Sequence, residues 1–159
     1  MMKMVYRLLL ATLLLACGAA RADGASTLKI SHPWIRMTPG AQVMAGYFSL
    51  TNAGSSKRVL TGVRSQAFAN AMLHKSIEKD GKSMMLHVDG GVEVAPGQTV
   101  TFAPGGYHVM LMRPVKPLTV GDKVAVDLLF QDKSSLTALF DVQPVWYQGP
   151  GASGGKGQQ

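Results

Sequence analysis

The chain has 159 residues, of which 47% are hydrophobic and 16% charged, and it contains a single cysteine. This length suits one domain, and one cysteine excludes an internal disulfide framework, so a hydrophobic core has to stabilise the fold. The formal net charge is +7, but the basic residues are scattered, without the clusters and interleaved aromatic residues of a nucleic-acid-binding surface, and we expect no nucleic acid as a partner.

Residues 1–22 have the features of a signal peptide. Lys3 and Arg7 form a positive region, residues 8–16 are apolar, and residues 20–22 (Ala-Arg-Ala) form a small-x-small cleavage site. The apolar run is too short to span a bilayer. Removal of this segment with its three basic residues lowers the formal net charge from +7 to +4. We therefore expect an exported, periplasmic protein.

Cys17 offers a second way to process this segment. Residues 14–17 (Leu-Leu-Ala-Cys) resemble a lipobox, in which the cysteine is acylated and becomes the first residue. We favour cleavage after Ala22, because the apolar run continues past Cys17 into the small-x-small site. The membrane is a partner only if Cys17 is lipidated, and neither product keeps a free thiol.

The remainder reads as many short strands separated by turn residues such as Asp80-Gly81 and Pro96-Gly97. No stretch keeps a helical period for three turns, although residues 66–72 are compatible with one turn of helix. This pattern predicts an all-β fold, a single β-sandwich or Greek-key domain over residues 23–146, followed by a Gly-rich disordered tail at 147–159. The predicted strands are 28–31, 44–52, 58–65, 71–77, 84–88, 98–103, 108–113, 123–131 and 136–142.

Histidine and methionine are concentrated between residues 72 and 112. A two-residue turn at Asp80-Gly81 predicts a hairpin in which His74 lies opposite His87, with Met85 diagonally across on the same face. A register shift by one residue would present Met84 instead of Met85. The opposite face of this hairpin is predicted to belong to the core, and it carries Leu73, Ile77, Met84, Leu86 and Val88.

A third element follows the turn at residues 104–106 (Pro-Gly-Gly). His108 and Met110 are two positions apart on a predicted strand, so they share a face, while Val109 and Leu111 are expected to face the core. Thioether sulfur suits Cu(I) far better than Mg, Ca or Zn, and imidazole suits copper in either oxidation state. A group of histidines and methionines without a thiolate therefore points to Cu(I).

These residues resemble the signature of the PCu(A)C family of periplasmic copper chaperones, a His, ten residues, a Met, about twenty-one residues and then His-x-Met. Here His74 is followed by 10 residues, Met85, 22 residues and His108-Val109-Met110. The second gap is one residue longer than in the family, and Lys75 replaces an optional methionine. Further similar blocks are residues 33–36, 45–48, 50–52 and 104–112.

The resemblance implies a cupredoxin-like Greek-key β-sandwich that binds one Cu(I) per chain through His74, Met85, His108 and Met110. It also implies delivery of copper to an acceptor, such as the CuA site of cytochrome c oxidase subunit II or another copper chaperone. We expect the protein to be a monomer. His87 is either a further ligand or an exposed strand histidine.

Other residues receive structural interpretations. Met72 and Met112 are expected to pack at the rim, and His32 to be structural or exposed. The core aromatic residues are expected to be Trp34, Tyr47 and Phe48.

Several other functions remain open. They are a periplasmic copper storage or tolerance protein and a structural β-sandwich without metal. An electron-transfer copper protein would need a cysteine thiolate, which the mature chain lacks. A copper enzyme with an N-terminal histidine does not fit a mature chain that begins at Asp23, and we expect no enzyme activity.

Overall fold

The computed structural model describes residues 27–151, which contain ten β-strands and no α-helix. The all-β prediction is confirmed, but the helical turn considered for residues 66–72 is wrong, because strand β4 (Phe68–Lys79) already begins at Phe68. The sequence pattern also did not predict the short strand β6 (Val92–Val94). The strands are β1 (Leu28–Met37), β2 (Val43–Asn52), β3 (Arg58–Arg64), β4 (Phe68–Lys79), β5 (Lys82–His87), β6 (Val92–Val94), β7 (Thr99–Phe102), β8 (Tyr107–Pro114), β9 (Lys123–Phe130) and β10 (Ser135–Pro144).

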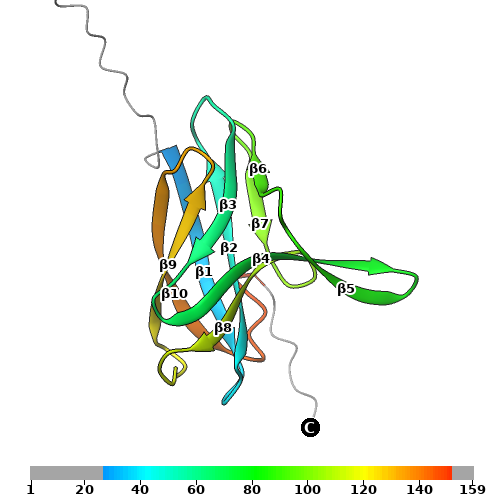
Figure 1. Cartoon of the computed structure of the whole chain (residues 1–159), viewed down its shortest axis with the longest axis vertical. Coiled ribbons are helices and arrows are strands. Elements are labelled where there is room, and N and C mark those ends of the chain that lie inside the picture. Colours follow the sequence, from blue (N-terminus) through cyan, green and yellow to red (C-terminus); the bar gives the residue numbers. More distant parts are fainter. Residues whose placement is uncertain (1–26, 152–159) are drawn as a thin grey trace, which may run out of the picture.

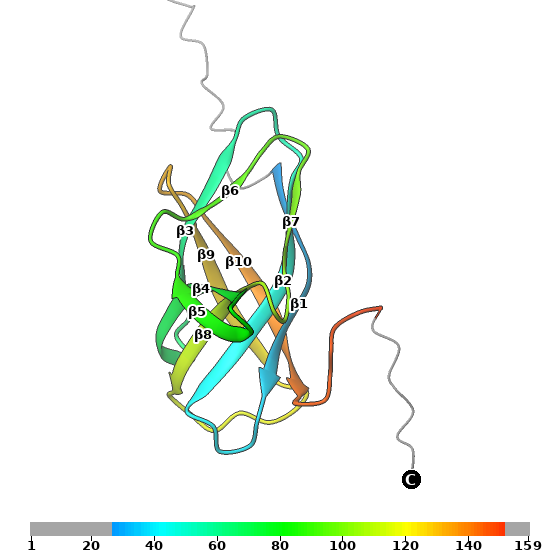
Figure 2. The ribbon, with the colours of Figure 1, turned by 90° about the vertical axis from the view of Figure 1, so that its right-hand side faces the viewer.

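The strands form one hydrogen-bonded sheet in the order β5-β4-β8-β7-β2-β1-β10-β9-β3-β6. β1 pairs in parallel with β10, and this pair joins the two halves of the sheet. Figure 2 shows β3, β9 and β10 on one side of the body and β7, β2 and β1 on the other. The predicted sandwich is thus two layers of one continuous sheet.

Alternating side chains of these strands fill the space between the two layers. On β9 every second residue is buried, from Val124 to Phe130, as expected of a strand with one face on the core. Phe48 of β2 stacks on Phe102 of β7 with ring centroids 4.3 Å apart. Val109 and Leu111 of β8 are fully buried, as predicted, so the alternate residues of β8 point out of the core.

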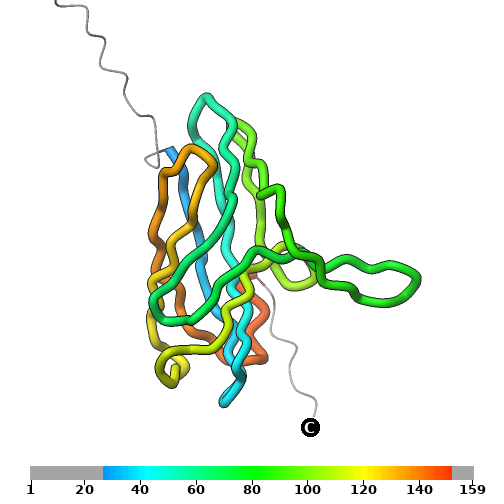
Figure 3. The backbone as a smooth tube through the Cα atoms, viewed as in Figure 1, coloured from blue at the N-terminus to red at the C-terminus, as the bar shows by residue number. Residues whose placement is uncertain are grey.

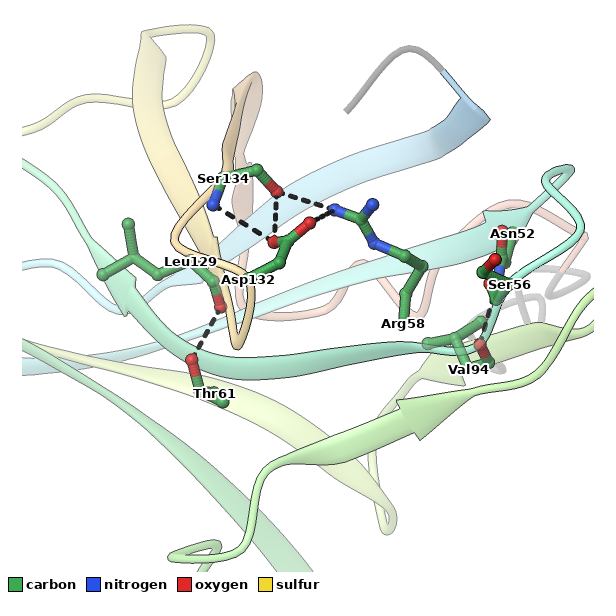
Figure 4. A network of polar contacts seen from close by, with 8 residues as sticks. All are labelled: Asn52, Ser56, Arg58, Thr61, Val94, Leu129, Asp132 and Ser134. Atoms are coloured by element: carbon green, nitrogen blue, oxygen red, sulfur yellow. Dashed lines mark hydrogen bonds and ion pairs between the residues drawn. The ribbon is translucent and has the colours of Figure 1, made fainter. Parts of the chain in front are cut away.

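Two buried polar side chains hold loops onto this body (Figure 4). The amide nitrogen of Asn52 donates to the carbonyl oxygens of Ser56 and Val94, at 2.8 and 3.0 Å. The guanidinium of Arg58 donates to the Ser134 hydroxyl at 2.6 Å and lies 2.9 Å from the Asp132 carboxylate. Because buried polar groups are costly without partners, these bonds stabilise the loops around β3.

The end of β4 and all of β5 project from the body as a long hairpin (Figures 1 and 3). Every residue of β5 is exposed, including Met84 at 45% and Leu86 at 43%. The prediction that one face of this hairpin belongs to the core is therefore wrong for β5. β5 is an edge strand that pairs only with β4, and the second layer of the sandwich does not extend beneath it.

Trp34 and Tyr47 are buried, as predicted, but on the outer face of the sheet. They are cross-strand partners on β1 and β2, and their neighbours Ile35 and Phe48 face the core. Tyr147 covers Trp34 edge-on at a centroid distance of 4.8 Å. Phe48 alone of the three expected core aromatic residues belongs to the main core.

The prediction assigned Tyr147 and Gln148 to the tail. Here the Arg36 guanidinium donates to the Tyr147 carbonyl at 3.3 Å and to the Gln148 side chain at 3.2 Å. The predicted signal peptide with Cys17 and the tail beyond residue 151 lie outside the described residues.

Candidate metal centre

β4 lies between β5 and β8, and this strand order brings His74, His87 and His108 together. His74 is the cross-strand partner of His87 on one side and of His108 on the other. The ring centroid of His74 lies 5.4 Å from that of His87 and 5.9 Å from that of His108. His74 is therefore the central imidazole of a row of three.

The turn of the hairpin sets which residues of β5 share this face. Asp80 and Gly81 both have positive φ, 52° and 71°, the conformation of the two-residue type I′ turn that matches strand twist. The predicted register is confirmed, with Met85 opposite Ser76. Met85 thus shares the face of His74 and lies diagonally across from it, whereas Met84 lies on the opposite face.

β8 places His108 deep in the site, with only 5% of its surface exposed. Its ring nitrogen Nδ1 lies 3.1 Å from the carbonyl oxygen of Gly106. Because a carbonyl can only accept, Nδ1 must be the nitrogen that carries the proton, and Nε2 keeps its lone pair. Donation from the second ring nitrogen to a backbone carbonyl is the usual way in which a protein orients a metal-binding histidine.

Two methionines flank the imidazoles. Met110 shares the outer face of β8 with His108, and its partner on β4 is Met72. Met110 is two residues from His108, the cross-strand partner of His74, and on the same face. It therefore lies diagonally across from His74. Met112, one step further, is opposite Asn70 and further from the histidines. β8 therefore contributes one buried imidazole and one thioether next to His74.

His74 is the histidine of this site with a buried ring nitrogen, Nδ1, that has no hydrogen bond within residues 27–151. Burial, and then repulsion from His108 and His87, lowers the pKa of His74, so the ring is neutral at pH 7 with a lone pair to donate. An orphaned buried nitrogen of this kind fits a metal ligand.

The donor set suits a soft cation. Within residues 27–151 no three His, Cys, Asp or Glu side chains lie close enough together to hold a metal by themselves. A metal at His74 and His108 would complete its coordination with thioethers on this face, where Met85 and Met110 lie diagonally across from His74. Thioethers favour Cu(I) over the hard divalent ions.

An aromatic cluster adjoins the site on the side of β2. The Tyr47 ring lies 6.4 Å from His108 and 4.6 Å from Trp34, centroid to centroid. Arg36 lies 5.4 Å from the centroids of both Trp34 and Tyr47. Burial raises the pKa of Tyr47 although Arg36 opposes the shift. This cluster shields His108 from water.

Sequence reasoning missed two neighbours of the histidines. Tyr47 gave no signal, because β2 and β8 are far apart in the chain. Asp89 could have been found from the sequence, because it stands two residues after His87. Its carboxylate lies 3.3 Å from His87 Nε2. His32 is exposed on β1, which pairs with none of β4, β5 and β8.

No helix in the described region, residues 27–151, is long and apolar enough to cross a membrane.

The family described as "Putative lipoprotein LpqE-like" matches residues 28–142. "Putative lipoprotein Lxx21020" of Leifsonia xyli subsp. xyli is 33% identical over 115 residues, which are 72% of this chain and 67% of that protein. "Uncharacterized protein RP573" of Rickettsia prowazekii is 29% identical over 107 residues, which are 65% of this chain and 59% of that protein. The chain thus matches about three fifths to two thirds of the length of these relatives.

Solved structures also resemble this chain. The copper-bound PCuAC domain from PmoF2 has a TM-score of 0.61 and 28% identity, over 74% of this chain and 93% of that one. The apo PCuAC domain from PmoF1 has a TM-score of 0.63 and 27% identity, over 74% and 94% of the two chains. The solution structure of CuI-DR1885 from Deinococcus radiodurans has a TM-score of 0.59 and 27% identity, over 79% and 85%.

The match to 115 consecutive residues and the shared fold agree with the resemblance that the His/Met pattern indicated, and the chain belongs to the LpqE-like family, with the fold of the PCuAC domains.

Proposed function

We propose that the protein is a copper chaperone, which binds one Cu(I) ion per chain and hands it to an acceptor protein. The observation that carries this proposal is His74, whose ring lies between the imidazoles of His87 and His108 and whose buried Nδ1 has no hydrogen-bond partner among residues 27–151. The similar PCuAC domain from PmoF2 is copper-bound and the similar DR1885 was solved as CuI-DR1885, and both support the choice of metal.

The proposed ligands are His74, Met85, His108 and Met110. His108 supplies Nε2, because its Nδ1 proton points at the Gly106 carbonyl. The two methionines lie on the same outer face, one on each side of His74. Imidazole lone pairs and thioethers are uncharged donors, so they leave the charge of Cu(I) unchanged, and a thioether has no proton to lose when it binds.

The exposure of the ligands supports a carrier. His108 is 5% exposed, whereas Met85, on the projecting hairpin, is 53% exposed. One half of the site is thus shielded by the body of the protein, and the other half is open to solvent and to a partner. An acceptor can approach the ion from the side of the hairpin and replace the exposed ligand first.

The acceptor is proposed to be a copper protein outside the cytoplasm, such as the CuA subunit of cytochrome c oxidase or another chaperone. The signal-peptide features of residues 1–22 support export. The lipoprotein descriptions of the family and of the Leifsonia relative lend weight to acylation at Cys17, the alternative to cleavage after Ala22. The mass of the mature protein distinguishes the two.

The test is a titration of the apoprotein with Cu(I) under anaerobic conditions, followed by X-ray absorption at the copper edge. We expect one Cu(I) per chain and about two nitrogen and two sulfur neighbours, as soft-metal sites of this donor set provide. The double substitution His108→Ala with Met110→Ala should abolish tight binding, whereas His32→Ala with Met112→Leu, as a control, should not. Absence of Cu(I) binding, or a shell without sulfur, would refute the proposal.

A further inference from the structure

His87 lies at the proposed site but is not one of the four proposed ligands. It is the direct cross-strand partner of His74, with its ring 5.4 Å away and perpendicular to the His74 ring. Backbone pairing continues past it, since Val88 N–H donates to the Leu73 carbonyl at 3.0 Å. His87 is thus held beside His74 by the sheet, although 48% of its side chain is exposed.

Asp89 gives His87 the surroundings of a metal-binding histidine. The Asp89 carboxylate lies 3.3 Å from Nε2 of His87. A carboxylate beside one ring nitrogen favours the tautomer with the proton on that nitrogen, and it leaves the lone pair on Nδ1. His108 has its Nδ1 hydrogen-bonded to the Gly106 carbonyl. Both outer imidazoles of the row therefore have one ring nitrogen near a protein oxygen, at 3.3 Å for His87 and 3.1 Å for His108.

The row of histidines has His74 at its centre, and this arrangement creates two overlapping pairs. The inner pair, His74 and His108, lies against the buried side of the site. The outer pair, His74 and His87, shares its face of the hairpin with Met85, two residues from His87 on the same strand. No group of three imidazoles in the described region is compact enough to bind a metal together, so the two pairs are alternatives.

We propose that His87, oriented by Asp89, is a transit ligand. Together with His74 and Met85 it forms an outer position through which Cu(I) leaves the site. This inference rests on the proposed function and describes how the cargo is released. His74 and Met85 keep their bonds to the ion, and the bond to His87 Nδ1 replaces the bonds to His108 and Met110. Copper remains Cu(I) throughout, so the step needs no electron and no proton.

The position of the hairpin explains why such a ligand is useful. The inner pair includes the buried His108, which lies beside Tyr47, and an acceptor side chain has little access to it there. All of β5 is exposed and projects from the body (Figure 1). A third coordinating group at the base of the hairpin lets the ion move outward without passing through a state with only two ligands.

The test first measures stoichiometry and then transfer. Wild-type protein and its variants are loaded with one Cu(I), their nitrogen and sulfur neighbours are counted by X-ray absorption, and the rate of transfer to excess bathocuproine disulfonate is followed by stopped-flow absorbance. His87→Ala should keep one Cu(I) and the wild-type shell but transfer it about tenfold more slowly. His32→Ala, the matched loss of an exposed histidine, should transfer at the wild-type rate.

Asp89 is tested as a positioning residue by the same rate. Asp89→Asn should slow transfer, Asp89→Glu should restore it, and Asp80→Asn, a matched change at the tip of the hairpin, should have no effect. Equal transfer rates for His87→Ala and His32→Ala would overturn the inference. So would a loaded His87→Ala with one nitrogen fewer, since His87 would then be a resident ligand. If the wild-type protein binds no Cu(I), the stoichiometry step shows that the proposed function itself has failed.

Discussion

Met84 and Met85 are neighbours on β5 that differ chiefly in the face they occupy, and this makes them a sharp test of the site. Met85 shares the face of His74, and Met84 lies opposite Ile77 on the other face. Their exposed fractions are similar, 53% and 45%. Substitution by leucine conserves volume and removes only the sulfur, so each variant should change the free energy of unfolding of the apoprotein by less than about 0.5 kcal/mol.

Copper affinity should separate the two variants. Met85→Leu removes one of the four proposed ligands and should weaken Cu(I) binding by about tenfold or more, which corresponds to about 1.4 kcal/mol. Met84→Leu should leave the affinity unchanged. Because binding to the native state adds to its stability, the copper-linked gain in unfolding free energy should fall by the same amount in Met85→Leu alone.

The assay is competition for Cu(I) against a chelator of known affinity, together with thermal unfolding of the apo and loaded proteins. An equal loss of affinity in both variants would show that the loss does not depend on the face of β5. A loss confined to Met84→Leu would show that the hairpin register in solution differs by one residue, and the face assignment would be wrong.

Three further outcomes test the scaffold that holds this site. Gly91→Ala should destabilise the fold by about 2 kcal/mol or more, because φ is +75° and a Cβ would lie 2.7 Å from the Leu60 carbonyl oxygen. Gly90→Ala is the control, since nothing lies within 4 Å of a Cβ there, and it should change the free energy of unfolding by less than about 0.5 kcal/mol. Chemical denaturation compares the two variants. Asn52→Ala should cost about 3 kcal/mol, since three hydrogen bonds of a fully buried amide are lost. Hydrogen bonds from Thr137 and Arg64 lower the pKa of Asp127 in the folded protein. The contribution of Asp127 to stability is therefore complete above its pKa in the unfolded chain, near pH ~4, and is lost as the pH falls toward its folded pKa. The stability difference between wild type and Asp127→Asn should therefore shrink on acidification below about pH 4, and a difference that grows there would contradict this reasoning.

Much of the strand pattern was predictable, and the errors have physical causes. Alternation on β8 identifies its buried face, because each strand of a sandwich has one face toward the core and one face outside. The three-residue strand β6 was missed because Val92 and Val94 are too few to show a period. The expected core face of the hairpin was wrong because apolar residues such as Leu86 occur on exposed strands as well, and composition does not reveal where the second layer ends.

The sequence by itself determined the local geometry of the site. Asp80 and Gly81 adopt the left-handed backbone that a two-residue turn requires, and this turn sets His74 opposite His87 with Met85 on their face. Only the tertiary structure decided that β8 pairs with the other edge of β4 and brings His108 within 5.9 Å of His74. The reason is that a tight turn specifies register between neighbouring segments. Pairing across more than thirty residues depends on how the whole sheet closes around its core, and on which faces that closure leaves outside.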